Sequence, residues 1–121
     1  MTANANRPGA RRPEDITRLF VERTNAADID GMLDLYEPGA VMAFPPGQLT
    51  VGHAAIRALF EQMIASRPAL KPEEPLQTLA VGDIALTATR ASDEAGARAQ
   101  VVRRQADGTW KRVLDRPDFR A

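Results

Sequence analysis

The chain has no cysteine and only one histidine, His53. Without thiols it can form neither disulfides nor thiolate metal sites, and it has no cysteine nucleophile. One histidine cannot build a conventional metal site by itself. Nucleotide-binding glycine motifs, the Gly-x-Ser-x-Gly elbow and the His-Glu-x-x-His zinc motif are all missing from the sequence. These absences predict a protein that uses neither a metal nor another cofactor.

Net charge and long apolar runs are also missing. Sixteen basic residues balance sixteen acidic ones, whereas a nucleic-acid-binding protein normally carries a basic surplus. No apolar run approaches the ~20 residues that a membrane-spanning helix needs. Because a cysteine-free composition is typical of reducing compartments, we expect a cytoplasmic protein with no nucleic-acid or membrane partner.

What the sequence does contain is enough for one domain. The 121 residues suit a single hydrophobic core. The first 12 residues are polar and are broken by Pro8 and Gly9, which predicts a disordered leader. The remainder, residues 13–121, is expected to form one domain.

Apolar residues at helical spacing predict three helices in the first half of the chain. The first covers residues 13–28. A second, shorter helix is expected to stop at Pro38, with Tyr36 on its apolar side. The third covers residues 52–68 and has a clear apolar stripe.

The second half changes to the two-residue period of strands. Together with short runs in the first half, we expect up to six strands, over residues 40–44, 49–51, 76–81, 84–91, 97–104 and 109–115. Helices first and antiparallel strands afterwards indicate an α+β fold. The prediction is a cone-like curved antiparallel sheet of four to six strands, a cone-shaped barrel, wrapped around three N-terminal helices.

Three segments carry a resemblance to a known superfamily. The stretch from Phe20 to Tyr36, the Gly-His-Ala-Ala-Ile-Arg from Gly52 and the Asp-Gly-Thr-Trp-Lys-Arg-Val from Asp107 resemble nuclear-transport-factor-2-like, ketosteroid-isomerase-like proteins. Such proteins enclose one apolar pocket and include SnoaL-like polyketide cyclases, epoxide hydrolases, dehydratases and enediyne-cluster proteins. In length and ending the chain is most similar to the last group.

The resemblance places the catalytic groups of ketosteroid isomerases on unsuitable residues here. Their oxyanion-donor tyrosine falls on Phe20, their general-base aspartate on Phe44, and a supporting tyrosine on Phe60. Their protonated aspartate falls near Gln100. Proton abstraction needs a base and strong hydrogen-bond donors, and phenylalanine provides neither. Steroid isomerisation is therefore rejected.

Asp115 and Tyr36 are the candidate catalytic residues. By strand alternation Asp115 and Val113 share a face, and the resemblance implies that this face lines the pocket. The other possibility for Asp115 is an ion pair with Arg116 or Arg90. Tyr36 could donate its hydroxyl into the pocket or could simply be a core aromatic residue.

The remaining pocket assignments follow the same pattern. Gln100 could orient a ligand carbonyl or lie on the solvated face, because the strand register is open. Trp110, Arg112 and Leu114 are expected to face outward, where two copies would pair, and Val102 is a candidate for either face. The predicted pocket lining is Phe20, Met42, Phe44, Phe60, Gln100, Val102 and Val113.

Three other polar features are predicted to be surface groups. His53 is expected to be an exposed residue at a helix start. Arg23 is expected to keep its guanidinium in water. Glu73 and Glu74 are adjacent acids on a predicted strand edge, and we interpret both as solvated.

The resulting hypothesis is a cofactor-independent enzyme that acts on a small apolar metabolite of natural-product type. Acid–base isomerisation, cyclisation or hydration would fit. Two alternatives stay open: a non-catalytic small-molecule binding protein and a dimeric partner-binding module.

Overall fold

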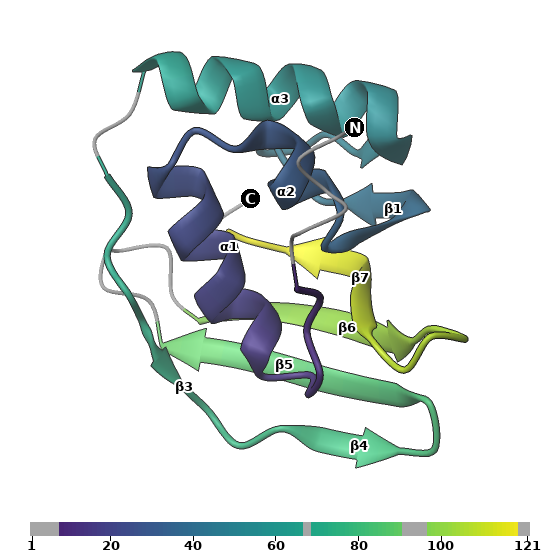
Figure 1. The fold of residues 1–121 in the computed structure, drawn as a ribbon. Coiled ribbons are helices and arrows are strands. Elements are labelled where there is room, and N and C mark those ends of the chain that lie inside the picture. Colours follow the sequence, from purple (N-terminus) through teal and green to yellow (C-terminus); the bar gives the residue numbers. More distant parts are fainter. Residues whose placement is uncertain (1–7, 67–68, 91–96, 119–121) are drawn as a thin grey trace.

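A curved sheet lies against three helices in the computed structural model, which describes residues 8–66, 69–90 and 97–118 (Figure 1). The helices are α1 (Asp15–Asn25), α2 (Ile29–Leu33) and α3 (Gly52–Ser66). The strands are β1 (Tyr36–Met42), β2 (Thr50–Val51), β3 (Glu74–Pro75), β4 (Leu79–Val81), β5 (Ile84–Arg90), β6 (Arg98–Arg104) and β7 (Trp110–Arg116). The predicted α+β class is confirmed.

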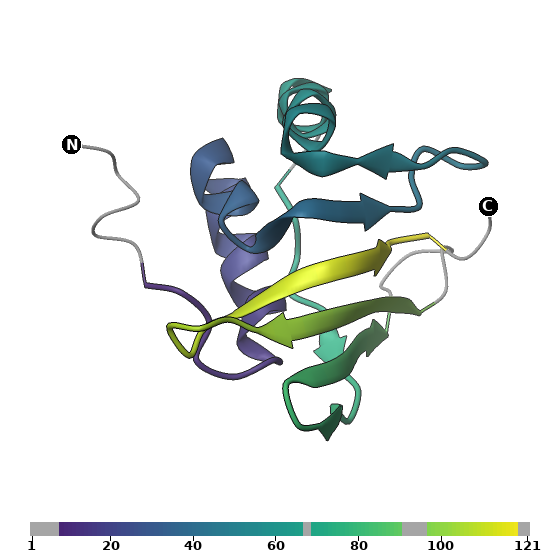
Figure 2. The same ribbon diagram turned by 90° about the vertical axis from the view of Figure 1, so that its right-hand side faces the viewer.

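The sheet is mixed and open. Its order is β2-β1-β7-β6-β5-β3, and β4 also pairs with β5. Figure 2 shows β1, β7, β6 and β5 side by side with a steady twist. The first and last strands, β1 and β7, run parallel, whereas the other pairs are antiparallel. We predicted four to six antiparallel strands, whereas the described sheet has seven strands and includes one parallel pair. The predicted barrel is wrong as well, because the sheet does not close.

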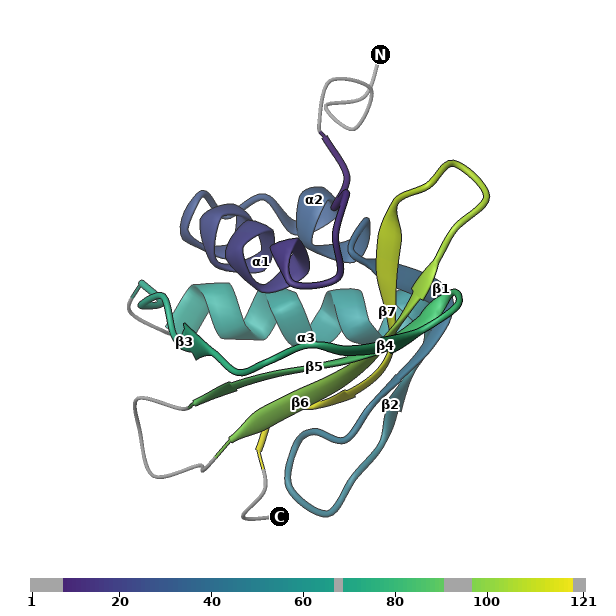
Figure 3. The same cartoon turned by 90° about the horizontal axis from the view of Figure 1, so that it is seen from below.

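All three helices cover one face of the sheet, as the view in Figure 3 makes clear for α1 and α3 above β5 and β6. The core forms between these layers from Ile16, Met32, Ile56, Phe60 and Val102, each at most 1% exposed. Phe60 and Tyr36 have ring centroids 5.7 Å apart. None of the described helices is long and apolar enough to cross a membrane.

The second predicted helix is shorter than expected, and Tyr36 is not part of it. Asp28 caps α2 by accepting a hydrogen bond from the Gly31 N–H at 3.1 Å, and the helix ends at Leu33. Tyr36 instead begins β1. Pro38, which we expected to stop a helix, lies within β1, where the pairing with β7 is irregular. A proline lacks the N–H that a regular ladder needs, so it is tolerated at such a bulge.

Part of the predicted leader is ordered. Residues 1–7 lie outside the described residues, but Ala10 is buried and accepts a hydrogen bond from the Trp110 N–H at 2.9 Å. Trp110, predicted to face outward, is therefore covered. Arg23 donates to the carbonyls of Gly31, at 2.9 Å, and Pro8. Its guanidinium is buried because it holds these segments together, which corrects the expectation of a solvated head.

Candidate functional site

A cavity of about 450 Å³ lies between the helices and the inner face of the sheet. Its helix side is mostly apolar, with Phe20, Val21, Leu59, Phe60 and Met63 beside the hydroxyl of Thr17. Its sheet side is mostly polar, with Thr89, Arg98, Gln100, Arg112 and Asp115 beside Tyr36 and Met42. The exposed residues Ala69 and Lys71 lie at its mouth. The predicted apolar pocket is therefore apolar on one side only.

A bulge in β7 places two charged side chains in this cavity. Val101 pairs with Leu114 and the next residue, Val102, pairs with Arg112, so Val113 is an extra residue in β7. The extra residue interrupts the alternation of faces. As a result Arg112 and Asp115, three positions apart, both point inward, and both are nearly inaccessible to solvent.

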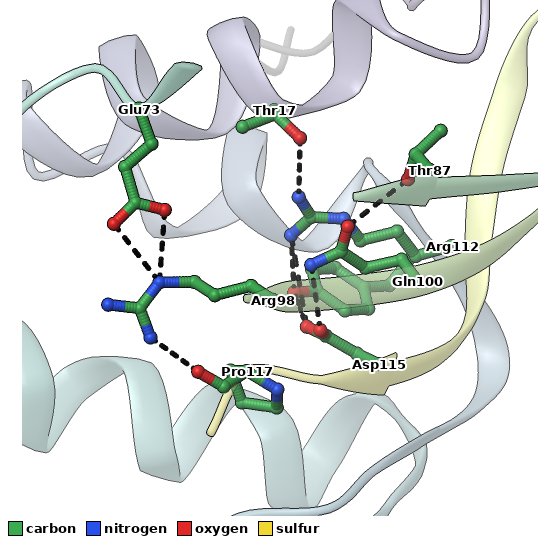
Figure 4. Close-up of polar contacts among 9 residues, drawn as sticks. Thr17, Glu73, Thr87, Arg98, Gln100, Arg112, Asp115 and Pro117 are labelled. Atoms are coloured by element: carbon green, nitrogen blue, oxygen red, sulfur yellow. Dashed lines mark hydrogen bonds and ion pairs between the residues drawn. The ribbon is translucent and has the colours of Figure 1, made fainter. Parts of the chain in front are cut away.

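The Asp115 carboxylate accepts hydrogen bonds on both oxygens (Figure 4). The Tyr36 hydroxyl donates to Oδ2 at 2.6 Å, and the Gln100 amide donates to Oδ1 at 3.1 Å. Gln100 is oriented in turn by Thr87, whose hydroxyl donates to Gln100 Oε1 at 3.1 Å. A carboxylate has about four lone-pair sites, so these two bonds do not exhaust its capacity to accept.

Arg112 provides a buried cation beside this carboxylate. Its Nη1 donates to the Tyr36 hydroxyl at 2.9 Å and lies 3.8 Å from Asp115 Oδ2. Its Nη2 donates to the Thr17 hydroxyl at 3.2 Å. The guanidinium also lies 4.9 Å from the centre of the Phe20 ring, a cation–π contact. Tyr36 thus bridges a cation and a carboxylate.

Burial keeps Tyr36 protonated. Removal from water raises the pKa of the Tyr36 hydroxyl, and the neighbouring Asp115 adds to this, while Arg112 opposes it. Burial by itself would lower the pKa of Arg112, but Tyr36 and Asp115 outweigh that effect and raise it. At neutral pH the site therefore holds a neutral phenol, which can donate a hydrogen bond, and a permanent cation.

A second polar group, which we call the mouth cluster, consists of Glu73, Thr89 and Arg98. Arg98 Nε lies 3.0 Å from Glu73 Oε1, and the Thr89 hydroxyl donates to the same oxygen at 3.0 Å. Arg98 also donates to the Pro117 carbonyl (Figure 4). Glu73, which we predicted to be solvated, has a side chain only 12% exposed. Its neighbour Glu74 is solvated as expected.

Most of the residues predicted for the site do line the cavity, but Val102 and Val113 do not. Val102 is fully buried in the core beside the cavity, and Val113 is the extra residue of the bulge. The predicted residues that form the cavity wall are Phe20, Tyr36, Met42, Phe44, Phe60, Gln100 and Asp115. The structure thus brings both catalytic candidates together.

Sequence reasoning missed Arg112 because strict alternation from Asp115 places it on the outer face. No local sequence signal marks the bulge at Val113. His53 also differs from its prediction: it is half-buried, and its Nε2 lies 2.8 Å from the backbone oxygen of Tyr36. It therefore links the start of α3 to the start of β1. Within the described ranges, no cluster of three or more acidic or histidine side chains could hold a metal ion.

Comparison with known protein families shows to which family the chain belongs. The family model of the SnoaL-like domain matches residues 17–113, which is most of the chain and includes α1 through most of β7. The chain belongs to the SnoaL-like domain family. This places it in the nuclear-transport-factor-2-like superfamily, as the resemblance implied. No curated protein sequence matches the chain.

Solved structures show the same fold at low sequence identity. A protein from Thiobacillus denitrificans, provisionally named a calcium/calmodulin-dependent protein kinase type II association domain, is 21% identical with a TM-score of 0.71 over 91% of this chain and 98% of that one. A ketosteroid isomerase-like protein from Erwinia carotovora is 18% identical with a TM-score of 0.68, covering 85% and 89%. An NTF2-like protein from Streptomyces avermitilis, provisionally named a dehydratase, is 16% identical with a TM-score of 0.67, covering 88% and 93%.

Proposed function

We propose that this SnoaL-like protein is a cofactor-independent enzyme that uses acid–base chemistry on a small, largely apolar metabolite of natural-product type. One observation carries the proposal. The Asp115 carboxylate is buried in the cavity wall, and the hydroxyl of Tyr36 and the amide of Gln100 hold it in position. A buried acid with oriented partners in a pocket is a typical arrangement for proton transfer.

The cavity has the size and the surface for such a ligand. Its volume of about 450 Å³ falls within the range of small-molecule sites. Phe20, Leu59 and Phe60 provide an apolar wall against which a ring or chain would pack. The polar groups of the sheet side would then fix the orientation of the ligand oxygen atoms.

In the proposed reaction Asp115 removes a proton from a carbon next to a carbonyl group. The C–H electron pair moves into the new C=C bond, and the carbonyl oxygen gains the negative charge. Arg112 supplies N–H donors and the positive charge that stabilise this oxyanion, and the Tyr36 hydroxyl, which donates to Asp115 in the resting site, turns to the oxyanion once Asp115 has taken the proton. In a substrate with a C=C bond conjugated to this enolate, Asp115 returns the proton to the far carbon as the C=O bond re-forms and the C=C bond shifts, which completes an isomerisation. In a β-hydroxy ketone, the C=O bond re-forms, the C–O bond to the hydroxyl breaks and Asp115 protonates the leaving hydroxide, which completes a dehydration.

This arrangement differs from the ketosteroid isomerase pattern. The positions of the isomerase base and oxyanion donor are occupied by Phe44 and Phe20, which are part of the cavity wall. Asp115, Tyr36 and Arg112 would take over these roles from β1 and β7. We therefore expect a different substrate from a steroid.

The experiment is deuterium exchange on enolisable ketones. A set of monocyclic and bicyclic ketones and hydroxy ketones is incubated with the protein in D₂O, and proton loss at the carbon next to the carbonyl is followed by NMR. We expect wild type to accelerate exchange on at least one compound, and Asp115→Asn to lose about 10²–10⁴-fold of that rate. Asp83→Asn, which alters an exposed acid, is the matched control. Equal rates for wild type and Asp115→Asn would refute the assignment.

A non-catalytic binding role is the second candidate, and a specific observation favours it. Both oxygens of Asp115 already accept hydrogen bonds inside the protein, and Arg112 lies close by. Such a network could serve only to hold a ligand. Tight binding of a ketone without exchange or turnover would support this role.

We also propose that two copies of the chain pair through the outer face of the sheet. A row of directly paired apolar residues crosses that face, and four of its six members are 41–57% exposed. The row is Leu79, Leu86, Val101, Leu114, Val41 and Val51. Extended apolar patches on a small protein commonly mark an interface. A second copy, which presents the same row, is the occupant that this proposal names.

A further inference from the structure

We infer that the substrate carries a second oxygen function, and that the mouth cluster recognises it. This inference rests on the proposed function, because it describes the substrate of the same cavity. The mouth cluster of Glu73, Thr89 and Arg98 lines the cavity but is separate from the site around Asp115. The reacting C–H would lie at Asp115 with its carbonyl oxygen beside Arg112, and the second oxygen would lie at the mouth.

Strand geometry sets the distance between the two sites. Gln100 and Arg98 are two residues apart on β6 and point to the same face, so their Cα atoms are about 7 Å apart. Across the ladder, Thr87 lies opposite Gln100 and Thr89 lies opposite Arg98. The inner face of the sheet therefore carries two successive polar rungs. Figure 4 shows Glu73 and Arg98 of the mouth cluster on one side and the Asp115 site on the other.

The chemistry of the mouth cluster suits a hydroxyl group. A hydroxyl both donates and accepts, so it can donate to the Glu73 carboxylate and accept from the Arg98 guanidinium. The side chains of these two residues are only 12% and 24% exposed, so hydrogen bonds to them are shielded from bulk water. A site built around polar side chains discriminates strongly against a ligand end that lacks the matching group.

The opposite wall limits how the ligand can lie. The helix side is apolar at Phe20, Leu59 and Phe60, and the hydroxyl of Thr17, the polar side chain that α1 adds to the described lining, already accepts a hydrogen bond from Arg112. A flat ligand would therefore turn its oxygen-bearing edge toward the sheet and its apolar opposite edge toward the helices. The substrate class that results is a flat, mostly apolar molecule with two oxygen functions about 7 Å apart along one edge.

The chain contains a matched control for the mouth cluster. Glu74 and Arg90 form another ion pair between β3 and β5, with Nε to Oε2 at 3.2 Å. Both side chains are about 70% exposed, at 70% and 69%, and neither lines the cavity. Removing this pair changes the charges at the same sheet edge without changing the cavity wall.

The test uses two fluorescent probes, 2-naphthol and 2,7-dihydroxynaphthalene. They share one ring system, and the second carries an additional hydroxyl on the same edge. We expect wild type to bind the diol about tenfold more tightly, the value of roughly one good hydrogen bond. In the double variant Glu73→Gln/Arg98→Met the ratio of the two affinities should fall close to one. Thr89→Val should reduce it in part.

The control variant Glu74→Gln/Arg90→Met should keep the full difference between the two probes. The inference is overturned if wild type binds both probes equally or binds neither, or if the mouth variant keeps the difference. Asp115→Asn separates this inference from the proposed function. If the function is wrong but the mouth subsite is real, Asp115→Asn leaves exchange unchanged, and the preference for the diol still depends on Glu73 and Arg98.

Discussion

In most sheets that are covered on one side, the buried face is apolar and the exposed face is polar. In the central strands of this sheet the polarity of the two faces is reversed. On the inner face, buried positions of β5, β6 and β7 carry polar or charged side chains: Thr87, Thr89, Gln100, Arg112 and Asp115. On the outer face, exposed positions of the same region carry large apolar ones: Leu79, Leu86 and Leu114. Buried polar groups cost free energy unless hydrogen bonds replace those to water, which is the case here, and exposing apolar area gains none. The pattern therefore adds less stability to one isolated chain than an apolar inner face and a polar outer face would.

The two faces are separated by a shift of a single residue. Thr87, Gln100, Asp115 and Met42 form one transverse row, and Leu86, Val101, Leu114 and Val41 form the adjacent one. Because neighbours along a strand point to opposite faces, a slip of one residue would exchange the two rows. An exchanged sheet would bury the leucines and expose the acid, as simple hydrophobicity prefers. The observed register makes sense if a ligand contacts the inner row and a second copy covers the outer row.

The largest effect is expected from breaking the inner face at Arg112. Arg112→Met removes the cation beside a buried carboxylate, and such a loss costs about 3–5 kcal/mol of unfolding free energy. Urea denaturation at neutral pH measures it. The double variant Arg112→Met/Asp115→Asn removes both charges and should regain much of the loss. A cost below about 1 kcal/mol for Arg112→Met would show that the pair is not electrostatically coupled.

The next largest effect is expected on the outer face. Leu114 lies in the middle of the apolar row and is 48% exposed in the single chain. Leu114→Glu should weaken the dimer by at least ~30-fold, since truncating or charging a central contact costs about 2 kcal/mol or more. Sedimentation over a concentration series measures the change. Leu49→Glu, at an exposed apolar residue outside the row, is the control. A wild type that stays monomeric at high concentration contradicts the dimer.

A smaller effect is expected when the bridge between the charges is removed. Tyr36→Phe deletes the hydroxyl that donates to Asp115 and accepts from Arg112, at a cost of about 1–3 kcal/mol. The pKa of Tyr36 is raised by burial, so its contribution to stability is complete below the unfolded pKa of about 10 and declines above it. Wild type should therefore lose stability more steeply than Tyr36→Phe above about pH 10. Parallel slopes would contradict this reading.

The smallest effect is expected at Glu37, outside both rows. A hydrogen bond from Arg103, at 2.8 Å, lowers the pKa of Glu37 from its usual 4.5 to about 2. Its stabilising contribution is present above pH 4.5 and is lost as the pH falls through about 2. Thermal melts in acid should thus show a slightly flatter decline for Glu37→Gln than for wild type. Above pH 5 the melting temperatures of wild type and Glu37→Gln should differ only by a constant offset.

The sequence was sufficient for the elements with a regular period. The stripes of α1 and α3 and the alternation in β5 and β6 predicted those elements to within a few residues. The prediction failed at Tyr36, because the following Pro38 is a typical helix stop. In the structure that proline lies in an irregular part of β1 instead. A proline indicates that regular secondary structure is interrupted, but it does not indicate whether the interrupted element is a helix or a strand.

The site could be predicted in part only. Asp115, Gln100 and the phenylalanines followed from the resemblance and from alternation. Arg112 could not be found, because one bulge residue, Val113, reverses the faces that alternation assigns. The mouth cluster was missed because Glu73 and Arg98 come from segments far apart in the chain. Only the pairing of β3 with β5 and of β5 with β6 brings them together.

A crystal structure of the protein with 2-naphthol bound tests the proposed site most directly. We expect the naphthol ring to lie in the cavity against Phe60, with its hydroxyl within hydrogen-bond distance of Asp115 or Tyr36. A ring that lies on the outer face beside Leu86 and Leu114, with the cavity free of ligand, would contradict it. In that case the polar inner row would be an internal ion-pair network and not a binding site.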